Sequence, residues 1–425
     1  HLRRAIDRRN IALMRMLELG VISSFEKSNA IAYTPRIARK RDGKSAPWAV
    51  DYALETLDAL HGIQATSNAS IQVRTTIDIS LQRIAEKAVG EGMQVIREGA
   101  SDAQVAMIAV DARNGDILAM VGGYDYREST FNRAVYGRRH IGSTVKGLTW
   151  LFAYASDPTL KGTTSVPDIP ISFPEQSSSW SPRNHDDQFL GAVSVTDALT
   201  QSRNIPAINM AQGIGFKQLS AMLNRVGLTD ATEFPSVALG AFEASPMDLC
   251  GAYTVFPGDG GYVQPRILRS VRMPDGTEGV EQSIDIYRAA NSRAAFLATK
   301  DLYKVVEVGT GRRVRSWVPN DILVGGKTGT TDKERDAWFV GFVGYTVIAV
   351  WVGVDKGKPL GMSGAEAAIP IWSRFVAAAG LDSMRRPAPK GVVRDSMCVE
   401  SNMVANSSCT DVTKVWHQDG EVQGC

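Results

Sequence analysis

Residues 105–121 read VAMIAVDARNGDILAMV, and this stretch is the clearest local structure in the chain. Two apolar runs, residues 105–110 and 117–121, enclose a polar connection that contains Asn114-Gly115. Asparagine and glycine tolerate the positive φ angles that tight hairpin turns need. The stretch therefore predicts a β-hairpin.

Further strands and helices are predicted on both sides of this hairpin. Strands are predicted at residues 73–77, 322–324, 338–343 and 346–354. Helices are predicted at residues 2–19, 80–96 and 365–379, with others that begin near Ser23, Val195 and Pro246. This order of elements predicts an α+β fold in which helices cover an antiparallel sheet.

The composition is that of a globular protein. The length of 425 residues predicts two or three domains, and 44% hydrophobic with 22% charged residues excludes wholesale disorder. The net charge of +2 gives no argument for a nucleic-acid partner. Apolar stretches such as residues 345–354 are too short to cross a bilayer. Because the chain begins at His1 inside a helical pattern, we interpret it as a fragment whose membrane anchor or leader lies upstream.

Three of the four cysteines, Cys398, Cys409 and Cys425, lie in a polar C-terminal tail without helical or strand periodicity. A segment with little core of its own is often held by a crosslink. We favour a disulfide between Cys398 and Cys409, although the sequence cannot fix the connectivity. A metal site is the alternative, but it lacks Cys-x-x-Cys spacing and has only His417 nearby. The disulfide would indicate an oxidising, extracytoplasmic setting.

Several common catalytic signatures are absent from the sequence. It contains no His-Glu-x-x-His and no Gly-x-Ser-x-Gly. Gly326-Lys327-Thr328 imitates the end of a phosphate-binding loop, but Asp321 stands where that loop needs glycine. The five histidines show no metal-ligand spacing, so we expect neither a metal nor a cofactor.

The candidate chemistry begins at Ser143-Thr-Val-Lys146, which precedes an apolar helical run. Residues three apart on a helix share a face, so the lysine could serve as the base for a serine nucleophile. This requires the lysine pKa to fall from about 10.4 toward 7 through burial or a second cation. Ser24-Phe-Glu-Lys27 has the same spacing and is predicted to have no chemical role. The motif alone is therefore weak evidence.

Two further motifs give the first one weight. Ser202-Arg-Asn204 is the only Ser-x-Asn in the chain, and Lys327-Thr-Gly329-Thr330 contains the only Lys-Thr-Gly. Each alone is compatible with a structural role, as a helix end or a turn. In this order the three motifs match the set of penicillin-binding proteins and class A β-lactamases.

The chain resembles the transpeptidase half of a class A, bifunctional penicillin-binding protein. The resemblance runs over residues 72–379 and is carried by several further segments: Thr75-Thr-Ile-Asp78 with Leu81-Gln-Arg83, the hairpin, Phe131-Asn-Arg133, Trp180-x-Pro182-x-Asn184, Ser245-Pro246 and Asp336-Ala-Trp-Phe-Val340 with Gly341. It implies an α+β penicillin-binding and β-lactamase-like transpeptidase fold. Residues 1–70 are predicted to be a linker after a missing glycosyltransferase domain, 71–385 the transpeptidase domain, and 386–425 a disulfide-linked tail.

The surroundings of the candidate nucleophile depart from the family pattern. The family usually has Gln-Pro before Gly-Ser, and Phe-Lys-Pro after it. This chain has His140-Ile141 before, and Val145 and Gly147 on either side of Lys146. A glycine in the first turn of a helix costs roughly 0.5–1 kcal/mol relative to alanine. These departures leave the rate and the β-lactam affinity open.

The resemblance also implies roles for the motif residues. Ser143 attacks the penultimate carbonyl of a D-Ala-D-Ala stem peptide, and Lys146 accepts its proton. Ser202 relays a proton to the leaving D-Ala, and Asn204 holds the substrate amide or Lys146. Lys327 supplies the second cation that keeps Lys146 neutral.

Substrate binding is assigned to residues near Lys327 and to three others. Lys327 with Thr328 and Thr330 draws the terminal carboxylate, and Gly329, lacking a side chain, lets a peptide lie along the strand. The backbone N–H groups of Ser143 and Thr330 form the oxyanion hole. The remaining residues expected to line the cleft are Trp180, Asn184 and Arg203.

The expected partners are peptidoglycan stem peptides, β-lactams, and possible lipoprotein activators and other wall synthases. The implied location is the periplasmic face of the bacterial inner membrane. The alternatives are a non-catalytic or weakly active scaffold of cell-wall synthesis, a serine β-lactamase and a β-lactam sensor domain. A class A β-lactamase would need a positioned glutamate before Lys-Thr-Gly.

Overall fold

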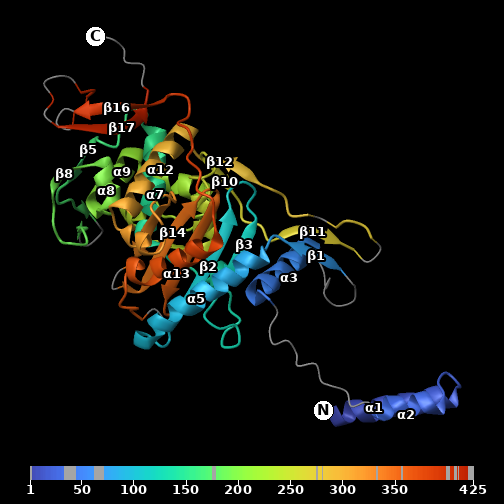
Figure 1. The fold of residues 1–425 in the computed structure, drawn as a ribbon. Coiled ribbons are helices and arrows are strands. Elements are labelled where there is room, and N and C mark those ends of the chain that lie inside the picture. The colour runs from blue at the N-terminus through green and yellow to red at the C-terminus, as the bar shows by residue number, and fades with distance from the viewer. Residues whose placement is uncertain are drawn as a thin grey trace. The chain divides into compact units, whose positions relative to one another are not determined.

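The structure is a computed structural model (Figure 1). It describes residues 2–32, 45–61, 71–174, 179–273, 276–279, 281–331, 334–355, 358–398, 403–405, 409 and 411–419. Contacts between residues divide the chain into two compact units, His1–Pro47 and Trp48–Cys425. The division falls within the segment that the sequence predicts to be a linker.

The first unit consists of two helices, α1 (Leu2–Glu18) and α2 (Ser24–Ala32). A capping box begins α2, because the carboxylate of Glu26 accepts a hydrogen bond of 2.8 Å from the backbone of Ser23, and Ser23 Oγ accepts one from the backbone of Glu26. Both helices were predicted. Part of the predicted linker, residues 33–44 and 62–70, lies outside the described residues.

A five-stranded antiparallel sheet forms the centre of the second unit, in the order β13-β14-β15-β2-β3. The strands are β2 (Gln104–Asp111), β3 (Ile117–Val121), β13 (Gly325–Thr330), β14 (Asp336–Val343) and β15 (Thr346–Gly353). The predicted hairpin is confirmed as β2 and β3. The strand predicted at residues 322–324 is wrong, because the chain there forms no strand and pairing with β14 begins at Gly325.

Helices cover both faces of this sheet (Figure 1). Helices α5 (Ile79–Gly99) and α13 (Gly364–Ala379) pack on the face that carries Val105, Met107 and Ala109. Helix α11 (Pro246–Tyr253) packs against β2 and β15 on the other face, where the thiol of Cys250 donates to the backbone carbonyl of Val347. Burial on both sides explains why residues 105–110 of β2 are all apolar instead of alternating with polar residues.

A group of helices beside the sheet carries two of the three motifs. It consists of α7 (Val145–Ser156), α8 (Val195–Thr200), α9 (Asn204–Ile214), α10 (Phe216–Arg225) and α12 (Ser292–Glu307). Helix α12 packs against both α7 and β13, so it joins the first motif to the third. A buried network supports this contact, because the Asp301 carboxylate accepts hydrogen bonds of 2.7 Å from the hydroxyls of Tyr154 on α7 and Thr196 on α8.

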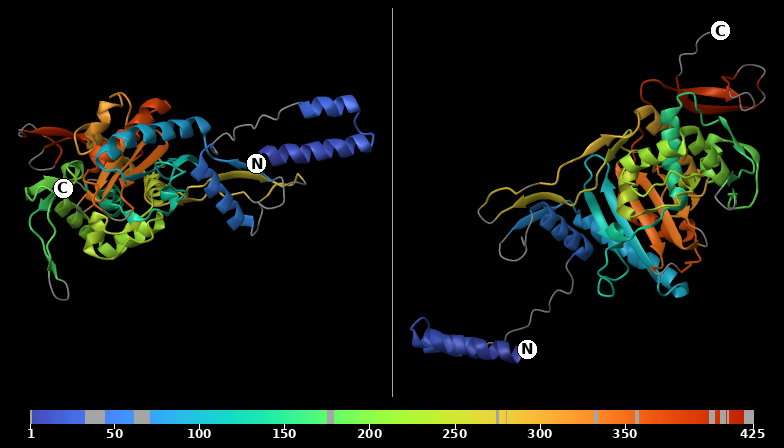
Figure 2. Two further views of the ribbon diagram at one scale, coloured as in Figure 1. Left: turned by 90° about the horizontal axis from the view of Figure 1, so that it is seen from below. Right: turned by 180° about the vertical axis from the view of Figure 1, so that it is seen from behind.

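Shorter elements complete the second unit. The helical ones are α3 (Pro47–His61), α6 (Arg133–Tyr136), η1 (Gly142–Thr144), η2 (Pro235–Leu239) and η3 (Arg312–Ser316). The paired strands are β1 (Gln72–Thr75) with β11 (Leu268–Arg272), β10 (Gly261–Val263) with β12 (Ile286–Arg288), β4 (Arg139–His140) with β9 (Glu243–Ala244), β5 (Ser165–Asp168) with β8 (Gly191–Ser194), and β6 (Phe173–Pro174) with β7 (Ser179–Trp180). Figure 2 shows the β1–β11 ribbon projecting away from the central sheet.

The C-terminal tail contains a hairpin that the sequence analysis did not predict. Strands β16 (Val392–Cys398) and β17 (Val412–Gln418) pair over their whole length, and a disulfide joins Cys398 to Cys409, the pair that the sequence favoured. The hairpin packs on α12 through Trp416, whose ring centroid lies 5.2 Å from that of Phe296. The expectation of a tail without strands was wrong, because packing and crosslinking stabilise strands whose own pattern is weak. Cys425 lies outside the described residues.

Candidate active site

The candidate nucleophile, Ser143, lies in the short η1 turn that leads into α7. Gly142 adopts a left-handed φ of 53°, and a Cβ atom there would lie 2.9 Å from the carbonyl oxygen of Thr330. The turn is therefore packed directly against the end of β13. Ser143 itself is half-buried and lines a large cleft.

The three motifs meet at the hydroxyl of Ser202. The amine of Lys146 donates to the carbonyl oxygen of Ser202 at 2.7 Å and to Asn204 Oδ1 at 2.7 Å, and it lies 3.4 Å from Ser202 Oγ. The amine of Lys327 donates to the same Ser202 Oγ at 2.8 Å and to the carbonyl oxygen of Thr328 at 3.1 Å. Two amines from distant segments thus face one hydroxyl, that of Ser202.

Burial controls the charge of these amines. Lys146 and Lys327 are fully buried, and neither forms an ion pair with a carboxylate in the described part of the chain. Burial, with the charges of Lys327 and Arg203, lowers the pKa of Lys146 well below its usual 10.5. Burial lowers the pKa of Lys327 to about 7. A neutral Lys146 at neutral pH can accept a proton, and burial contributes more to this than the second cation does.

The backbone of Ser202 is held in an uncommon conformation. Its φ of 57° lies in the left-handed region, which non-glycine residues rarely adopt. Hydrogen bonds of 3.0 Å from its own N–H to Leu199 and 2.9 Å from the N–H of Arg203 to Ala198 fix this conformation. As a result both the carbonyl and the hydroxyl of Ser202 are directed at the amines. Such strain commonly occurs at functional sites.

Two residues expected to line the cleft lie behind it instead. Arg203 is 5% exposed and forms an ion pair with the fully buried Asp168. Asn184 donates to Asp168 at 2.7 Å, and its Oδ1 accepts from the backbone N–H of Asn204 at 2.8 Å. Asn184 therefore caps the beginning of α9 and positions Asn204. The sequence could not show this, because the spacing of polar residues does not reveal which way they face.

The cleft has a volume of about 1120 Å³. It is lined by Ser143, Ser202, Asn204, Thr328, Thr330 and Trp180 among others. Arg183, Arg312 and Arg313 add positive charge to its walls. These arginines, and Thr310, whose hydroxyl is 2.8 Å from that of Thr328, were missed in the sequence. The sequence signal for Thr310, Arg312 and Arg313 was the polar, basic run Thr310-Gly-Arg-Arg313, which lies between a helix and the Lys-Thr-Gly strand.

Gly329 has a packing role in addition to the one expected of it. A Cβ atom at Gly329 would lie 2.7 Å from both the carbonyl oxygen of Ile141 and Cγ2 of Thr144. Glycine is therefore needed because the nucleophile turn packs against β13 at this residue. The strand still has a free edge, because β13 is the outermost strand of its sheet. Its side chains Thr328 and Thr330 face the cleft.

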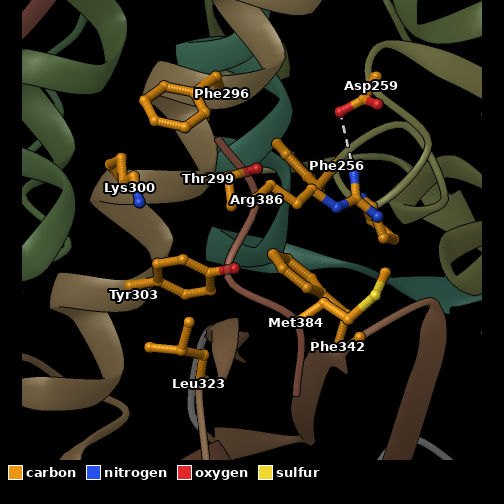
Figure 3. A pocket seen from close by; sticks show the side chains of 12 residues that line it. Phe256, Asp259, Phe296, Thr299, Lys300, Tyr303, Leu323, Phe342, Met384 and Arg386 are labelled. Atoms are coloured by element: carbon orange, nitrogen blue, oxygen red, sulfur yellow. Dashed lines mark hydrogen bonds and ion pairs between the residues drawn. The ribbon is translucent and has the colours of Figure 1, made fainter. Parts of the chain in front are cut away.

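A second pocket lies apart from the three motifs (Figure 3). Its walls are mainly aromatic, formed by Phe256, Phe296, Tyr303 and Phe342. Its volume of about 20 Å³ has room for about one water molecule. Arg386 at its edge is already paired with Asp259 at 3.0 Å. This pocket is therefore not the candidate active site.

Two further properties concern the described residues alone. They contain no group of three or more His, Cys, Asp or Glu side chains arranged to hold a metal ion. Among the helices that the structure describes, none combines the length and the apolar character needed to traverse a bilayer.

Comparisons with known proteins agree with this geometry. Residues 105–377 match the family described as the penicillin binding protein transpeptidase domain. Penicillin-binding protein 1B of Escherichia coli (strain K12) is 30% identical over 424 residues, which are 98% of this chain and 50% of that protein. Penicillin-binding protein 1A of Neisseria gonorrhoeae is 34% identical over 305 residues, 68% of this chain and 38% of that protein. The chain thus spans about half the length, or less, of these curated relatives.

Solved structures share the fold. Penicillin-binding protein 1A from Haemophilus influenzae superposes with a TM-score of 0.84 at 21% identity, over 99% of this chain and 82% of that one. The PonA1 protein from Mycobacterium tuberculosis, solved in complex with penicillin V, gives a TM-score of 0.71 at 22% identity, over 82% of this chain and 97% of that one. Both comparisons support the predicted α+β transpeptidase fold.

Proposed function

Because the chain belongs to the penicillin-binding protein transpeptidase family, we propose that it is a serine D-Ala-D-Ala transpeptidase. It cross-links peptidoglycan stem peptides through an acyl-enzyme, and β-lactams acylate the same serine. One observation carries the proposal: the amines of Lys146 and Lys327 meet at Ser202 Oγ, at 3.4 and 2.8 Å, in the cleft that Ser143 lines.

The hydrogen bonds of Lys146 support its role as the base. A neutral amine has two N–H groups and one lone pair. Two acceptors at 2.7 Å, the carbonyl of Ser202 and Oδ1 of Asn204, can take both N–H groups. The lone pair is then left for the hydroxyl proton of Ser143, three residues earlier at the start of the same helix. Ser143 Oγ attacks the penultimate D-Ala carbonyl as that proton moves to Lys146.

The second half of the reaction uses Ser202. Its hydroxyl contacts both amines, so it can pass a proton from Lys146 to the nitrogen of the departing D-Ala. The acyl group stays on Ser143 as an ester until the amine of a second stem peptide attacks it. We assign the oxyanion hole to the backbone N–H groups of Ser143 and Thr330.

The terminal carboxylate of the donor peptide is assigned to the β13 side of the cleft. Lys327 is a buried cation on this strand, and the side chains of Thr328 and Thr330 beside it line the cleft. Trp180 also lines the cleft and packs against Phe173, with ring centroids 5.7 Å apart. Asn184 and Arg203 support Asn204 from behind and are not assigned to the substrate.

The whole protein and its location are further proposals. Since the curated relatives are about twice as long as this chain, the intact protein is proposed to carry a peptidoglycan glycosyltransferase before residue 1. It would be anchored in the inner membrane with this chain on the periplasmic side. The disulfide between Cys398 and Cys409 fits an oxidising compartment. Lipoprotein activators and other wall synthases are proposed partners.

Labelling with a fluorescent penicillin tests the proposal. We expect one label per chain, complete loss of label in Ser143→Ala, and full label in the matched control Ser24→Ala, which removes a serine from the other Ser-x-x-Lys segment. A folded wild-type chain that takes no label would refute the transpeptidase and support a scaffold. Rapid release of hydrolysed drug would indicate a β-lactamase instead.

A further inference from the structure

Gly147 lies in the first turn of α7, directly after Lys146. A Cβ atom at this position would lie 2.8 Å from the hydroxyl oxygen of Tyr253 and 3.4 Å from Cδ2 of Leu302. The first distance is shorter than side chains tolerate. The glycine that departs from the family pattern is thus explained by the tyrosine hydroxyl, which fills the space beside it.

Tyr253 is the last residue of α11 and is buried. Its hydroxyl donates a hydrogen bond to the carbonyl oxygen of Thr144, the residue next to Ser143. Its ring contacts that of Phe256 at a centroid distance of 5.0 Å, and Phe256 stacks on Phe342 of β14 at 5.9 Å. The hydroxyl is therefore held in place by the packed core beside the central sheet.

We propose that Tyr253 is a positioning residue for the nucleophile, because its hydroxyl fills the space of a side chain at Gly147 and anchors the carbonyl of Thr144. This inference rests on the proposed function of Ser143. Proline, which the family usually has after the lysine, restricts the helix start through its fixed φ. Here glycine leaves that turn free, and the hydrogen bond from α11 restrains it from outside.

The anchored carbonyl belongs to Thr144, which stands between Ser143 and Lys146 in the sequence. Thr144 separates Ser143 from Val145 and Lys146, so movement of its carbonyl shifts the serine hydroxyl relative to the amine. A misplacement of about 1 Å can cost on the order of 10²-fold in rate. Loss of the anchor should consequently slow acylation without weakening the initial binding of the drug in the cleft.

The experiment compares four variants of the full chain: Tyr253→Phe, Gly147→Ala, the double variant and Tyr303→Phe. Tyr303→Phe is the matched control, because it removes the hydroxyl of a half-buried tyrosine that lies in the pocket of Figure 3 and not at the nucleophile turn. Stopped-flow measurement with a fluorescent penicillin separates the acylation rate constant from the dissociation constant of the non-covalent complex. Thermal unfolding of each variant is measured in parallel.

We expect Tyr253→Phe to lower the acylation rate constant about three- to tenfold, the loss of one hydrogen bond, with an unchanged dissociation constant. Tyr303→Phe should change neither. Gly147→Ala should slow acylation and lower the melting temperature with Tyr253 present, and should do both far less in the Tyr253→Phe background, where the clashing oxygen is gone.

Two results would overturn the inference. One is an unchanged acylation rate constant in Tyr253→Phe while the wild type is acylated, which leaves the proposed function intact. The other is an equal effect of Gly147→Ala on the melting temperature in both backgrounds, which needs no activity at all. Absence of acylation in the wild type would instead refute the proposed function, while the unfolding data still decide the contact between positions 147 and 253.

Discussion

Two segments of this chain have a serine followed three residues later by a lysine, but the burial and the neighbours of these residues differ. Ser24 and Lys27 lie on the short helix α2, where Ser24 is exposed. Ser143 and Lys146 lie at the start of α7, where the lysine is fully buried and a second amine lies nearby. The same local spacing thus exists with and without the surroundings that make a base of lysine. Chemistry at this motif comes from tertiary burial.

Removing the lysines gives the largest expected difference between the two segments. Lys146→Ala should lower the acylation rate constant by about 10²–10⁴-fold, the usual contribution of a general base. Lys27→Ala should leave it unchanged. Time courses of fluorescent penicillin labelling measure both. Equal effects of the two substitutions would show that burial does not distinguish the function of Lys146 from that of Lys27.

The pH dependence of acylation sharpens the comparison. Lys146 must be neutral to accept a proton, and burial favours that form by lowering its pKa. Lys327 must be charged to draw a carboxylate, and its pKa is about 7. The second-order rate constant, which reports the free enzyme, should therefore fall about tenfold per pH unit above about pH 7.

Two variants test the origin of this alkaline decline. Lys327→Arg should remove it, because arginine stays charged. Lys27→Ala should keep the wild-type profile. A wild-type rate constant that stays flat between pH 7 and pH 9 would show that the charge of Lys327 is not needed.

The smallest expected effect concerns the helix that carries the second serine-lysine pair. Ser23→Ala removes the N-cap of α2, a loss of about 1 kcal/mol of local helix stability. Hydrogen exchange of the amides in residues 24–32 should speed up about fivefold, while penicillin labelling stays the same. Slower labelling in this variant would indicate that the first unit contributes to the site.

Much of this site could be predicted from the sequence because its motifs are short and local. The β2–β3 hairpin followed from its apolar runs and its Asn114-Gly115 turn. The meeting of Lys146, Ser202 and Lys327 beside the cleft that Ser143 lines could be predicted only through the resemblance to a known family. Nothing in the local pattern of any one motif specifies the other two.

What the sequence did not reveal depends on contacts between distant segments. Helix α12 was missed although its Asn291 cap and amphipathic spacing were present in the sequence, and the C-terminal hairpin has only a weak pattern. The packing of both on α7 appears only in three dimensions. Asn184 and Arg203 carry polar groups that could face either way, and pairing with Asp168 turns them inward. From the sequence, Gly147 is expected to destabilise the first turn of α7. The structure shows that the hydroxyl of Tyr253 occupies the space that a side chain would need there.

The two buried amines have a consequence for the protein as a whole. Both pKa values are lower in the folded chain than in the unfolded one, so the unfolded chain binds these two protons more tightly. At neutral pH and below, the protonated amines therefore lower the free energy of unfolding. For Lys327 this destabilisation is relieved only as the pH rises from about 7 toward 10.5. Selection for thermal robustness alone would replace both residues with hydrocarbon side chains. Under the proposed function, the same two amines that lower the stability of the fold accept the proton and attract the substrate carboxylate.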